Sequence, residues 1–252
     1  MNHNRFLLLI FLVLLIGTIV FLTDGVRTGD KQAEQDENLL VTYVVDPSKT
    51  DVSFFWKNDN QPFKSIENLR LWLEQKNQRL VFAMNAGMYQ SDNSPKGLYI
   101  EKGVIKVPLD TASGEDNFYL KPNGVFYIGT DKAPAICTTS EFSPNGSNAY
   151  YATQSGPMLV VDGKINPAFK PASTNLNIRN GVGILPDNRA VFAMSKRGVT
   201  FYEFAAYFRR IGCKNALYLD GLVSRTYLPE KACTQTDGDF GVMIGVSVPA
   251  KK

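Results

Sequence analysis

The sequence predicts an α+β fold: a single domain with a mixed, strand-rich and partly barrel-like central sheet packed by two main helices. Short β-branched and aromatic runs that end in turn residues recur along the chain, and only two segments carry apolar residues at helical spacing. The order of these elements is not a regular strand–helix–strand alternation, which favours α+β over α/β. The chain has 252 residues and 44% hydrophobic content, enough for one sizeable core.

The two helices are predicted at residues 65–77 and 200–211. The first, SIENLRLWLEQKN, repeats its apolar residues at helical spacing and begins at Ser65, a favoured N-cap. The second, TFYEFAAYFRRI, places aromatic residues on one side, and Gly212 follows as a C-terminal stop.

The strands are predicted in the runs LLVTYVVDP, VSFFWKND, RLVFAMNAG, GLYIEKGVIKVPL, NFYLKPNGVFYIG and MLVVDGKINP. Lys102 and Gly103 predict a hairpin turn within the fourth of these runs. The segments RLVFAMNAGMY and RAVFAMSKRGV share five residues at matching offsets, so each is expected to be a central strand that ends in a functional loop.

The N-terminal segment is expected to direct export. Arg5 is followed by 17 uncharged residues, a length between a signal-peptide core and a membrane span. We therefore expect residues 1–27 to be a signal anchor or a signal peptide, residues 28–38 a polar tether, and residues 39–252 the folded domain. The protein is expected to be periplasmic or otherwise extracytoplasmic, either secreted or anchored to the membrane through this segment.

Composition excludes several classes of function. The only histidine is His3, ahead of the apolar segment, so histidine-dependent nucleophilic catalysis and imidazole zinc sites are excluded. A formal net charge of +3 without a basic stripe argues against a nucleic-acid partner, and no metal or cofactor is predicted. Cys137, Cys213 and Cys233 leave two alternatives open: a disulfide between the last two, or three buried thiols.

Polar groups gather in four loops at the predicted strand ends: residues 85–89, 154–157, 175–181 and 220–221. Four such loops in one small domain suit a pocket for a polyhydroxylated ligand, although each loop taken alone is more typical of an ordinary turn. Arg179 and Arg225 lie in or beside the loops and are candidates to bind an anionic group; the alternative is a solvated surface charge.

Four segments carry a resemblance to a known family: FAMNAGMY, QSGPMLVVDGKIN, IRNGVGI and NALYLDGLVSRTY. In this order and spacing they resemble the phosphodiester glycosidase family, over roughly Val81 to Val246. The resemblance implies a cleft built on a mixed sheet and hydrolysis of a sugar-1-phosphodiester at its glycosidic bond. Residues that match the family by position are Asn85, Gly87, Ser155, Gly156, Pro157, Arg179, Gly181, Asp220, Gly221 and Ser224.

The sequence departs from the family at Leu222 and Val223, which replace two glycines. Bulkier residues restrict the approach of the backbone to a phosphate, so we expect a different substrate or lost activity.

Glycoside hydrolysis uses two carboxylates, and the catalytic residues are predicted as Asp220, Glu115 and Arg179. Asp116 is an alternative to Glu115, Glu203 is expected to cap or salt-bridge its own helix, and Arg179 is expected to stabilise the departing phosphate. The predicted function is hydrolysis of a sugar-1-phosphodiester in an envelope glycan or glycolipid; the alternative is a non-catalytic carbohydrate-binding or structural envelope protein. The predicted substrate-binding residues are Asn85, Gly87, Gln154, Ser155, Gly156, Asn180, Gly181, Gly221, Ser224 and Arg225.

Overall fold

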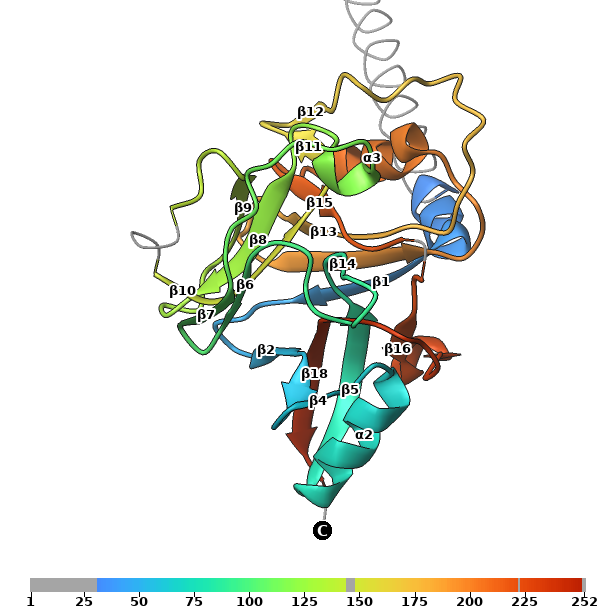
Figure 1. The fold of residues 1–252 in the computed structure, drawn as a ribbon. Coiled ribbons are helices and arrows are strands. Elements are labelled where there is room, and N and C mark those ends of the chain that lie inside the picture. The colour runs from blue at the N-terminus through green and yellow to red at the C-terminus, as the bar shows by residue number, and fades with distance from the viewer. Residues whose placement is uncertain (1–30, 144–147, 222, 251–252) are drawn as a thin grey trace, which may run out of the picture. The chain divides into compact units, whose positions relative to one another are not determined.

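The computed structural model describes residues 31–143, 148–221 and 223–250 (Figure 1). The chain divides into two compact units, residues 1–39 and 40–252. The predicted signal anchor or signal peptide lies outside the described residues. Within the described ranges, no helix is long and apolar enough to cross a membrane.

The described part of the predicted polar tether is a helix over residues 31–39. This segment is rich in Gln, Glu and Ala, which have good helix propensity. The Gln32 side chain donates a hydrogen bond to Asp36 Oδ1, 3.2 Å away and one turn further on. The tether prediction overlooked this propensity.

Residues 40–252 form three main sheets and one short hairpin. The six-stranded sheet contains, in spatial order, β1 (Leu40–Val45), β14 (Ala190–Ser195), β13 (Asn180–Ile184), β15 (Ala216–Tyr218), β11 (Met158–Val161) and β12 (Lys164–Ile165). One five-stranded sheet contains β7 (Val104–Val107), β6 (Tyr99–Glu101), β10 (Ala149–Ser155), β8 (Gly124–Gly129) and β9 (Pro134–Thr138). The other contains β17 (Cys233–Thr234), β16 (Thr226–Leu228), β5 (Gln78–Asn85), β18 (Met243–Pro249) and β2 (Val52–Phe55). The short hairpin pairs β3 (Lys57–Asn58) with β4 (Gln61–Pro62).

The α+β class is confirmed, but the predicted sheet differs in two respects. The strands form three separate sheets rather than one central sheet, and none of these closes into a barrel. Every strand pair in the described part of the chain is antiparallel rather than mixed. Many of these pairs join strands that are far apart in the sequence, such as β1 with β14 and β5 with β18, so the pattern of short strand runs did not reveal them.

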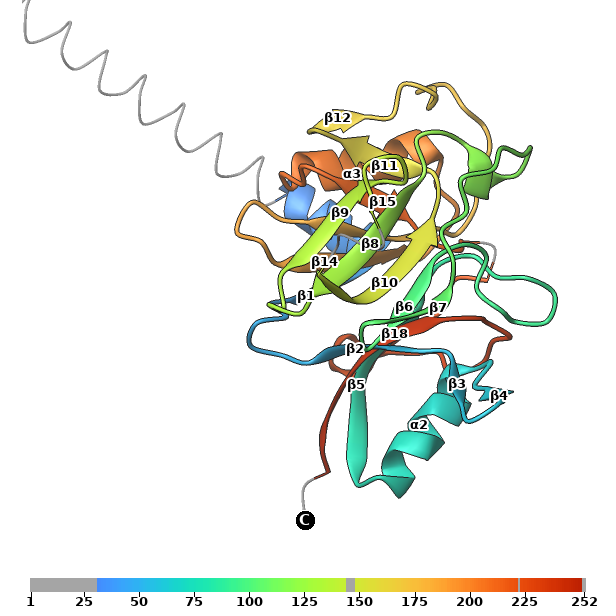
Figure 2. The same ribbon diagram turned by 60° about the vertical axis from the view of Figure 1, so that its left-hand side comes forward.

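Both predicted helices are confirmed. Helix α2 (Ile66–Gln75) packs against the sheet that contains β5, and α3 (Phe201–Arg210) packs against β11 and β12 (Figures 1 and 2). Ser65 caps α2 by accepting a hydrogen bond from the Asn68 amide, 3.2 Å away. The short 3₁₀ segments are η1 (Asn117–Tyr119) and η2 (Pro229–Lys231).

Helix α3 begins with a capping box. Thr200 Oγ1 accepts from the Glu203 amide at 3.1 Å, and the Glu203 carboxylate accepts from the Thr200 amide at 2.8 Å. Gly212 follows the helix with a φ of 86°, a conformation that favours glycine. The capping role predicted for Glu203 is confirmed, and its carboxylate is bound at the start of its own helix.

One aromatic cluster connects the three main sheets. Phe192 of β14 lies 5.2 Å from Phe82 of β5 and 5.7 Å from Phe126 of β8, measured between ring centroids. Phe82 and Phe192 occupy matching positions of the two similar segments RLVFAM and RAVFAM. Both segments are buried strands, as predicted, and their phenylalanines meet in the shared core.

The three cysteines are free thiols, so the disulfide alternative between Cys213 and Cys233 is wrong. Cys213 packs under Gly183 of β13, where a Cβ on the glycine would lie 2.7 Å from the Cys213 sulfur. Burial raises the pKa of this thiol to about 12. Cys233 instead donates a hydrogen bond to the Thr226 carbonyl, 3.1 Å away.

Candidate functional site

Asp220 lies where two sheets meet. It follows β15, and its amide donates to the Ala86 carbonyl at 3.0 Å, in the loop that follows β5. The Asn85 side chain donates to the Asp220 carbonyl at 2.6 Å. The loop after β15 is therefore bonded to the end of β5, and Asn85 and Ala86 bind the carbonyl and the amide of Asp220.

A buried amide network supports this junction. Asn180 Nδ2 donates to Asn85 Oδ1 at 3.0 Å, and the Arg225 amide donates to the same oxygen at 2.9 Å. Asn85 and Asn180 are almost completely buried. The side-chain nitrogens of these two predicted substrate-binding residues bind the protein and position the loops, while Asn180 Oδ1 is buried and makes no hydrogen bond with the described part of the chain.

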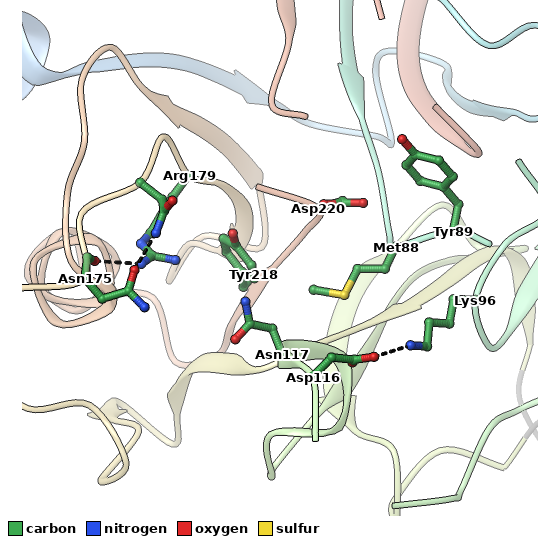
Figure 3. A pocket seen from close by; sticks show the side chains of 10 residues that line it. Met88, Tyr89, Lys96, Asp116, Asn117, Asn175, Arg179, Tyr218 and Asp220 are labelled. Carbon is green, nitrogen blue, oxygen red and sulfur yellow. Dashed lines mark hydrogen bonds and ion pairs between the residues drawn. The ribbon is translucent and has the colours of Figure 1, made fainter. Parts of the chain in front are cut away.

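Beside Asp220 lies a pocket of about 300 Å³, here called the Asp220 pocket (Figure 3). Side chains from β15, the segments after β5 and β15, η1 and the loop before β13 converge on it. Its lining residues are Met88, Tyr89, Lys96, Asp116, Asn117, Asn175, Asn177, Arg179, Tyr218 and Asp220.

Arg179 is a buried cation at one end of the Asp220 pocket. Its Nε donates to the Val199 carbonyl at 2.9 Å, and its Nη2 donates to the Asn175 carbonyl at 3.0 Å. The guanidinium carbon lies 3.6 Å from the centroid of the Phe201 ring, so the cation stacks on an aromatic face. Burial lowers the pKa of Arg179, although an arginine remains charged at neutral pH. This geometry fixes a positive charge at the pocket wall.

Tyr218 lies between Arg179 and Asp220 (Figure 3). Burial raises the pKa of its hydroxyl, the charge of Arg179 opposes this shift, and the charge of Asp220 adds to it. A Cβ placed on Gly221 would lie 1.8 Å from the Tyr218 hydroxyl oxygen. Glycine is therefore required at position 221 for the tyrosine to occupy this place.

The other end of the Asp220 pocket carries Tyr89 and an ion pair. Lys96 Nζ lies 2.5 Å from Asp116 Oδ2 and 4.7 Å from the centroid of the Tyr119 ring. Burial, followed by the charges of Asp220 and Asp239, raises the pKa of Tyr89. The carboxylate of Asp220 thus lies among hydroxyl groups, with fixed cations towards both ends of the pocket.

The structure brings two of the three predicted catalytic residues, Asp220 and Arg179, to one pocket. Glu115, the third, is exposed and does not line it. Its neighbour Asp116 does line it. The difference arises because Asp116 caps η1, accepting from the Phe118 amide at 3.0 Å, which fixes its carboxylate towards the pocket.

Gln154 is a structural residue. Its Oε1 accepts from the amides of Leu98 at 2.9 Å and Asp110 at 3.0 Å. Its Nε2 donates to the Asp110 carbonyl at 2.6 Å. The side-chain amide is saturated by the protein, and Gln154, predicted to bind the substrate, does not line the Asp220 pocket.

The predicted glycines at 87, 156 and 181 lie at close backbone contacts and do not line the Asp220 pocket. A Cβ at these positions would approach backbone oxygens to 2.4 Å at Gln154, 2.6 Å at Phe118 and 2.8 Å at Leu217, respectively. Ser155 is fully buried and does not line the pocket either. The turn that contains it still contributes, because the Pro157 carbonyl accepts from the Tyr218 amide at 3.1 Å.

Gly221, Ser224 and Arg225 line a different pocket of about 560 Å³. Arg225 does not offer a free guanidinium there, since its Nε and Nη2 bind the two carboxylate oxygens of Asp237 at 2.8 and 2.7 Å. Ser224 Oγ donates to the Gly221 carbonyl at 2.9 Å. These three residues shape the loop that carries Asp220.

Three residues of the Asp220 pocket escaped the sequence analysis: Lys96, Asn117 and Tyr218. Tyr218 was detectable, because it precedes Asp220 by two positions in an extended segment and so shares its face. Lys96 lies in a loop and Asn117 begins the short 3₁₀ segment η1, and no sequence period reveals the direction of either side chain.

Comparison with known proteins identifies the family of the chain. Residues 78–246 match the phosphodiester glycosidase family. The chain belongs to this family. The resemblance predicted from Val81 to Val246 is confirmed, and the phosphodiester glycosidase region runs from β5 to β18.

The chain is similar to two bacterial proteins that are themselves uncharacterized. YigE of Escherichia coli (strain K12) is 38% identical over 221 residues, which are 86% of each chain. The SPbeta prophage-derived protein YomE of Bacillus subtilis (strain 168) is 28% identical over 158 residues, which are 58% of this chain and 24% of that protein.

Solved structures show the same fold. The catalytic domain of zebrafish N-acetylglucosamine-1-phosphodiester alpha-N-acetylglucosaminidase, auto-inhibited by its pro-peptide, superposes with a TM-score of 0.58 at 12% identity, over 82% of both chains. A protein from Synechocystis superposes with a TM-score of 0.53 at 13% identity, over 83% of this chain and 59% of that one.

Proposed function

We propose that this protein is a hydrolase that cleaves the glycosidic bond of a sugar-1-phosphodiester. The observation that carries the proposal is the Asp220 pocket, in which a member of this family places a carboxylate and a buried guanidinium on either side of a tyrosine. The reaction adds water across the bond between the anomeric carbon and the phosphate oxygen. The products are a free sugar and a phosphomonoester, which leaves with the bonding electron pair.

In this mechanism Asp220 acts on the sugar and Arg179 on the phosphate. A displacement at the anomeric carbon requires the attacking group and the leaving group on opposite sides. The order Asp220, Tyr218, Arg179 along the pocket provides that separation. A phosphate leaving group carries its own charge and needs little protonation, so a fixed cation replaces a general acid. Asp116, paired with Lys96, is the second carboxylate of the pocket in this proposal.

The departure from the family at Leu222 and Val223 fits the same scheme. Val223 packs against the hydrophobic cluster around Phe240 and Met243. The Val223 side chain is therefore part of the packing of the domain. Because valine stands where the family has glycine, the backbone of this loop is less accessible to a phosphate. We propose that the phosphate is held by the side chain of Arg179 rather than by amides of this loop.

The substrate is proposed to be an envelope glycan or glycolipid, and the protein to act outside the cytoplasm. The uncharged apolar segment at residues 6–22 supports export. Two alternatives differ in what the pocket does. A non-catalytic carbohydrate-binding protein would bind sugar in the Asp220 pocket without hydrolysing it, and a structural envelope protein would bind no sugar there.

The test is incubation of the full-length protein with sugar-1-phosphodiesters and measurement of the free sugar released. Wild-type protein should release sugar, and Asp220→Asn should lower the rate by a factor of at least about 100, since one charged catalytic group is lost. Asp59→Asn is the matched control, because Asp59 is exposed in the turn between β3 and β4. Full activity of Asp220→Asn would reject the assignment of this residue. Sugar binding without release by wild-type protein would favour the binding-protein alternative.

A further inference from the structure

A pocket of about 480 Å³, here called the Tyr150 pocket, shares no lining residue with the Asp220 pocket in the described part of the chain. Three separate segments form its walls: the connection from β1 into β2, the turn between β8 and β9, and the start of β10. The first of these walls, residues 47–53, precedes the region of residues 78–246 that matches the family. The lining residues that enter the argument are Asp51, Ser53, Thr130, Lys132, Tyr150 and Tyr151.

A β-bulge directs two neighbouring tyrosines into this pocket. Successive side chains of a regular strand point to opposite faces of the sheet. The register between β10 and β8 shifts between Ala149 and Tyr151, so Tyr150 is an extra residue in β10. Tyr150 and Tyr151 consequently both line the Tyr150 pocket. Bulges redirect side chains in this way and are over-represented beside functional sites, which makes this one a pointer to a ligand.

The two rings provide a rigid aromatic surface. Tyr151 is 7% exposed, and its ring stacks on Phe54 of β2 with the centroids 5.3 Å apart. Tyr150 is 40% exposed, and its ring meets the Tyr151 ring edge to face at 5.0 Å. The buried ring supports the exposed one, so a ligand that packs on Tyr150 meets a surface that is already ordered.

The rim of the Tyr150 pocket carries paired charges and hydroxyl groups. Lys132 Nζ lies 2.8 Å from Asp51 Oδ1, which joins the β8–β9 turn to the β1–β2 connection. These side chains are 54% and 82% exposed, so their ion pair contributes little to stability and is open to a ligand. Ser53 and Thr130 add hydroxyls. Asp51 and Lys132 are the two charged lining residues in the described part of the chain, so the rim has donors and acceptors but no net charge.

We propose that the Tyr150 pocket binds a neutral sugar unit of a glycan. A sugar ring has apolar C–H faces that can pack on the Tyr150 ring, and its hydroxyls can donate to Asp51 and accept from Lys132. The volume falls in the range of about 300–1,000 Å³ that small-ligand sites occupy. The site goes beyond the proposed function, because its side chains are separate from Asp220 and Arg179 and its ligand need not be hydrolysed.

The first test measures binding of saccharides to the full-length protein by calorimetry. The probes are the neutral tetrasaccharides maltotetraose, chitotetraose and mannotetraose, with tetragalacturonate as the anionic comparison. At least one neutral probe should bind more tightly than tetragalacturonate, and Tyr150→Ala should weaken its binding by a factor of about 10. Tyr150→Phe keeps the ring and should retain most of the affinity. Leu71→Ala, which removes an exposed apolar side chain from α2, should retain all of it.

The Asp220→Asn variant distinguishes this site from the Asp220 pocket. Binding that Asp220→Asn leaves unchanged and Tyr150→Ala weakens would support the inference, whether or not the protein hydrolyses a sugar-1-phosphodiester. Binding that Asp220→Asn abolishes and Tyr150→Ala leaves unchanged would assign the saccharide to the Asp220 pocket and overturn the inference. Failure of every neutral probe to bind would overturn it as well.

The second test needs no variant. Tetranitromethane nitrates exposed tyrosines, and mass spectrometry of the digested protein locates the modified residues. The neutral probe that binds most tightly should protect Tyr150 from nitration. Tyr227 of β16, a partly buried tyrosine that does not line this pocket, should react equally with and without the probe. Nitration of Tyr150 that the saccharide leaves unchanged would contradict the proposed site.

Discussion

At the scale of single residues, the Asp220 pocket depends on groups that do not line it. Gly221 leaves the space that the Tyr218 hydroxyl occupies, and Phe201 supports the guanidinium of Arg179. Asn85 has the same supporting character, because its side chain joins the loops after β5 and β15. Mutations of such residues should therefore affect stability and activity together.

Replacement of Asn85 by alanine tests this dependence. The change leaves the Asp220 carbonyl and the Arg225 amide without their Asn85 partner, and Asn180 Nδ2 keeps only its bond to the Asn85 carbonyl. We expect the free energy of unfolding to fall by about 2–4 kcal/mol, because buried polar groups lose hydrogen bonds. Urea denaturation measures this change, with Asn60→Ala, an exposed site, as the control. A loss as small as that of Asn60→Ala would contradict the supporting role.

At the scale of secondary-structure elements, the ends of strands and the start of α3 place the pocket residues. β5 and β15 belong to different sheets, yet their following loops meet at Asp220. Helix α3 presents Phe201 in its first turn, where the ring stacks against the guanidinium of Arg179. The cap of α3 therefore matters for the site as well as for the helix.

Thr200→Ala removes the capping box of α3. We expect a loss of about 1–2 kcal/mol in the free energy of unfolding, because the Glu203 amide loses its acceptor and Thr200 is buried. Since the first turn carries Phe201, the KM for a sugar-1-phosphodiester should rise as well. Thr200→Ser retains the capping hydroxyl and should restore most of both losses. Equal effects of the two substitutions would show that the methyl group, rather than the cap, is responsible.

At the scale of the whole described domain, the three sheets share one hydrophobic core. The core cluster contains residues from each of them, with Phe192 in contact with rings from the other two. Sheets that share a core cannot lose their packing independently. Residues 40–252 should therefore unfold as one cooperative unit.

The two tryptophans provide the measurement. Trp56 lies 5.9 Å from Tyr99 beside the core, whereas Trp72 lies on α2, 5.2 Å from Phe63. Single-tryptophan variants, Trp56→Phe and Trp72→Phe, report on these two regions separately by fluorescence. We expect each fluorescence transition to coincide with loss of secondary structure in the same variant. A Trp72 transition at lower denaturant than the circular dichroism change would show that α2 unfolds separately.

The sequence predicted local structure well, because local structure depends on neighbouring residues. Ser65 and Gly212 marked the boundaries of their helices, and Lys102 and Gly103 form the predicted turn between β6 and β7. The family motifs also directed attention to Asp220 and Arg179, which share a pocket. The sheet was predicted less well: strand patterns establish that strands exist, but they do not show which strands pair.

The sequence by itself determined the class, the helices, the family and the two charged residues at the centre of the candidate site. Only the tertiary structure decided which neighbours accompany them. It selected Asp116 over Glu115, added Tyr218 and Lys96, and assigned Gln154 and Arg225 to protein partners. The physical reason is that the direction of a loop side chain is set by hydrogen bonds to segments distant in sequence, and no local pattern encodes those partners.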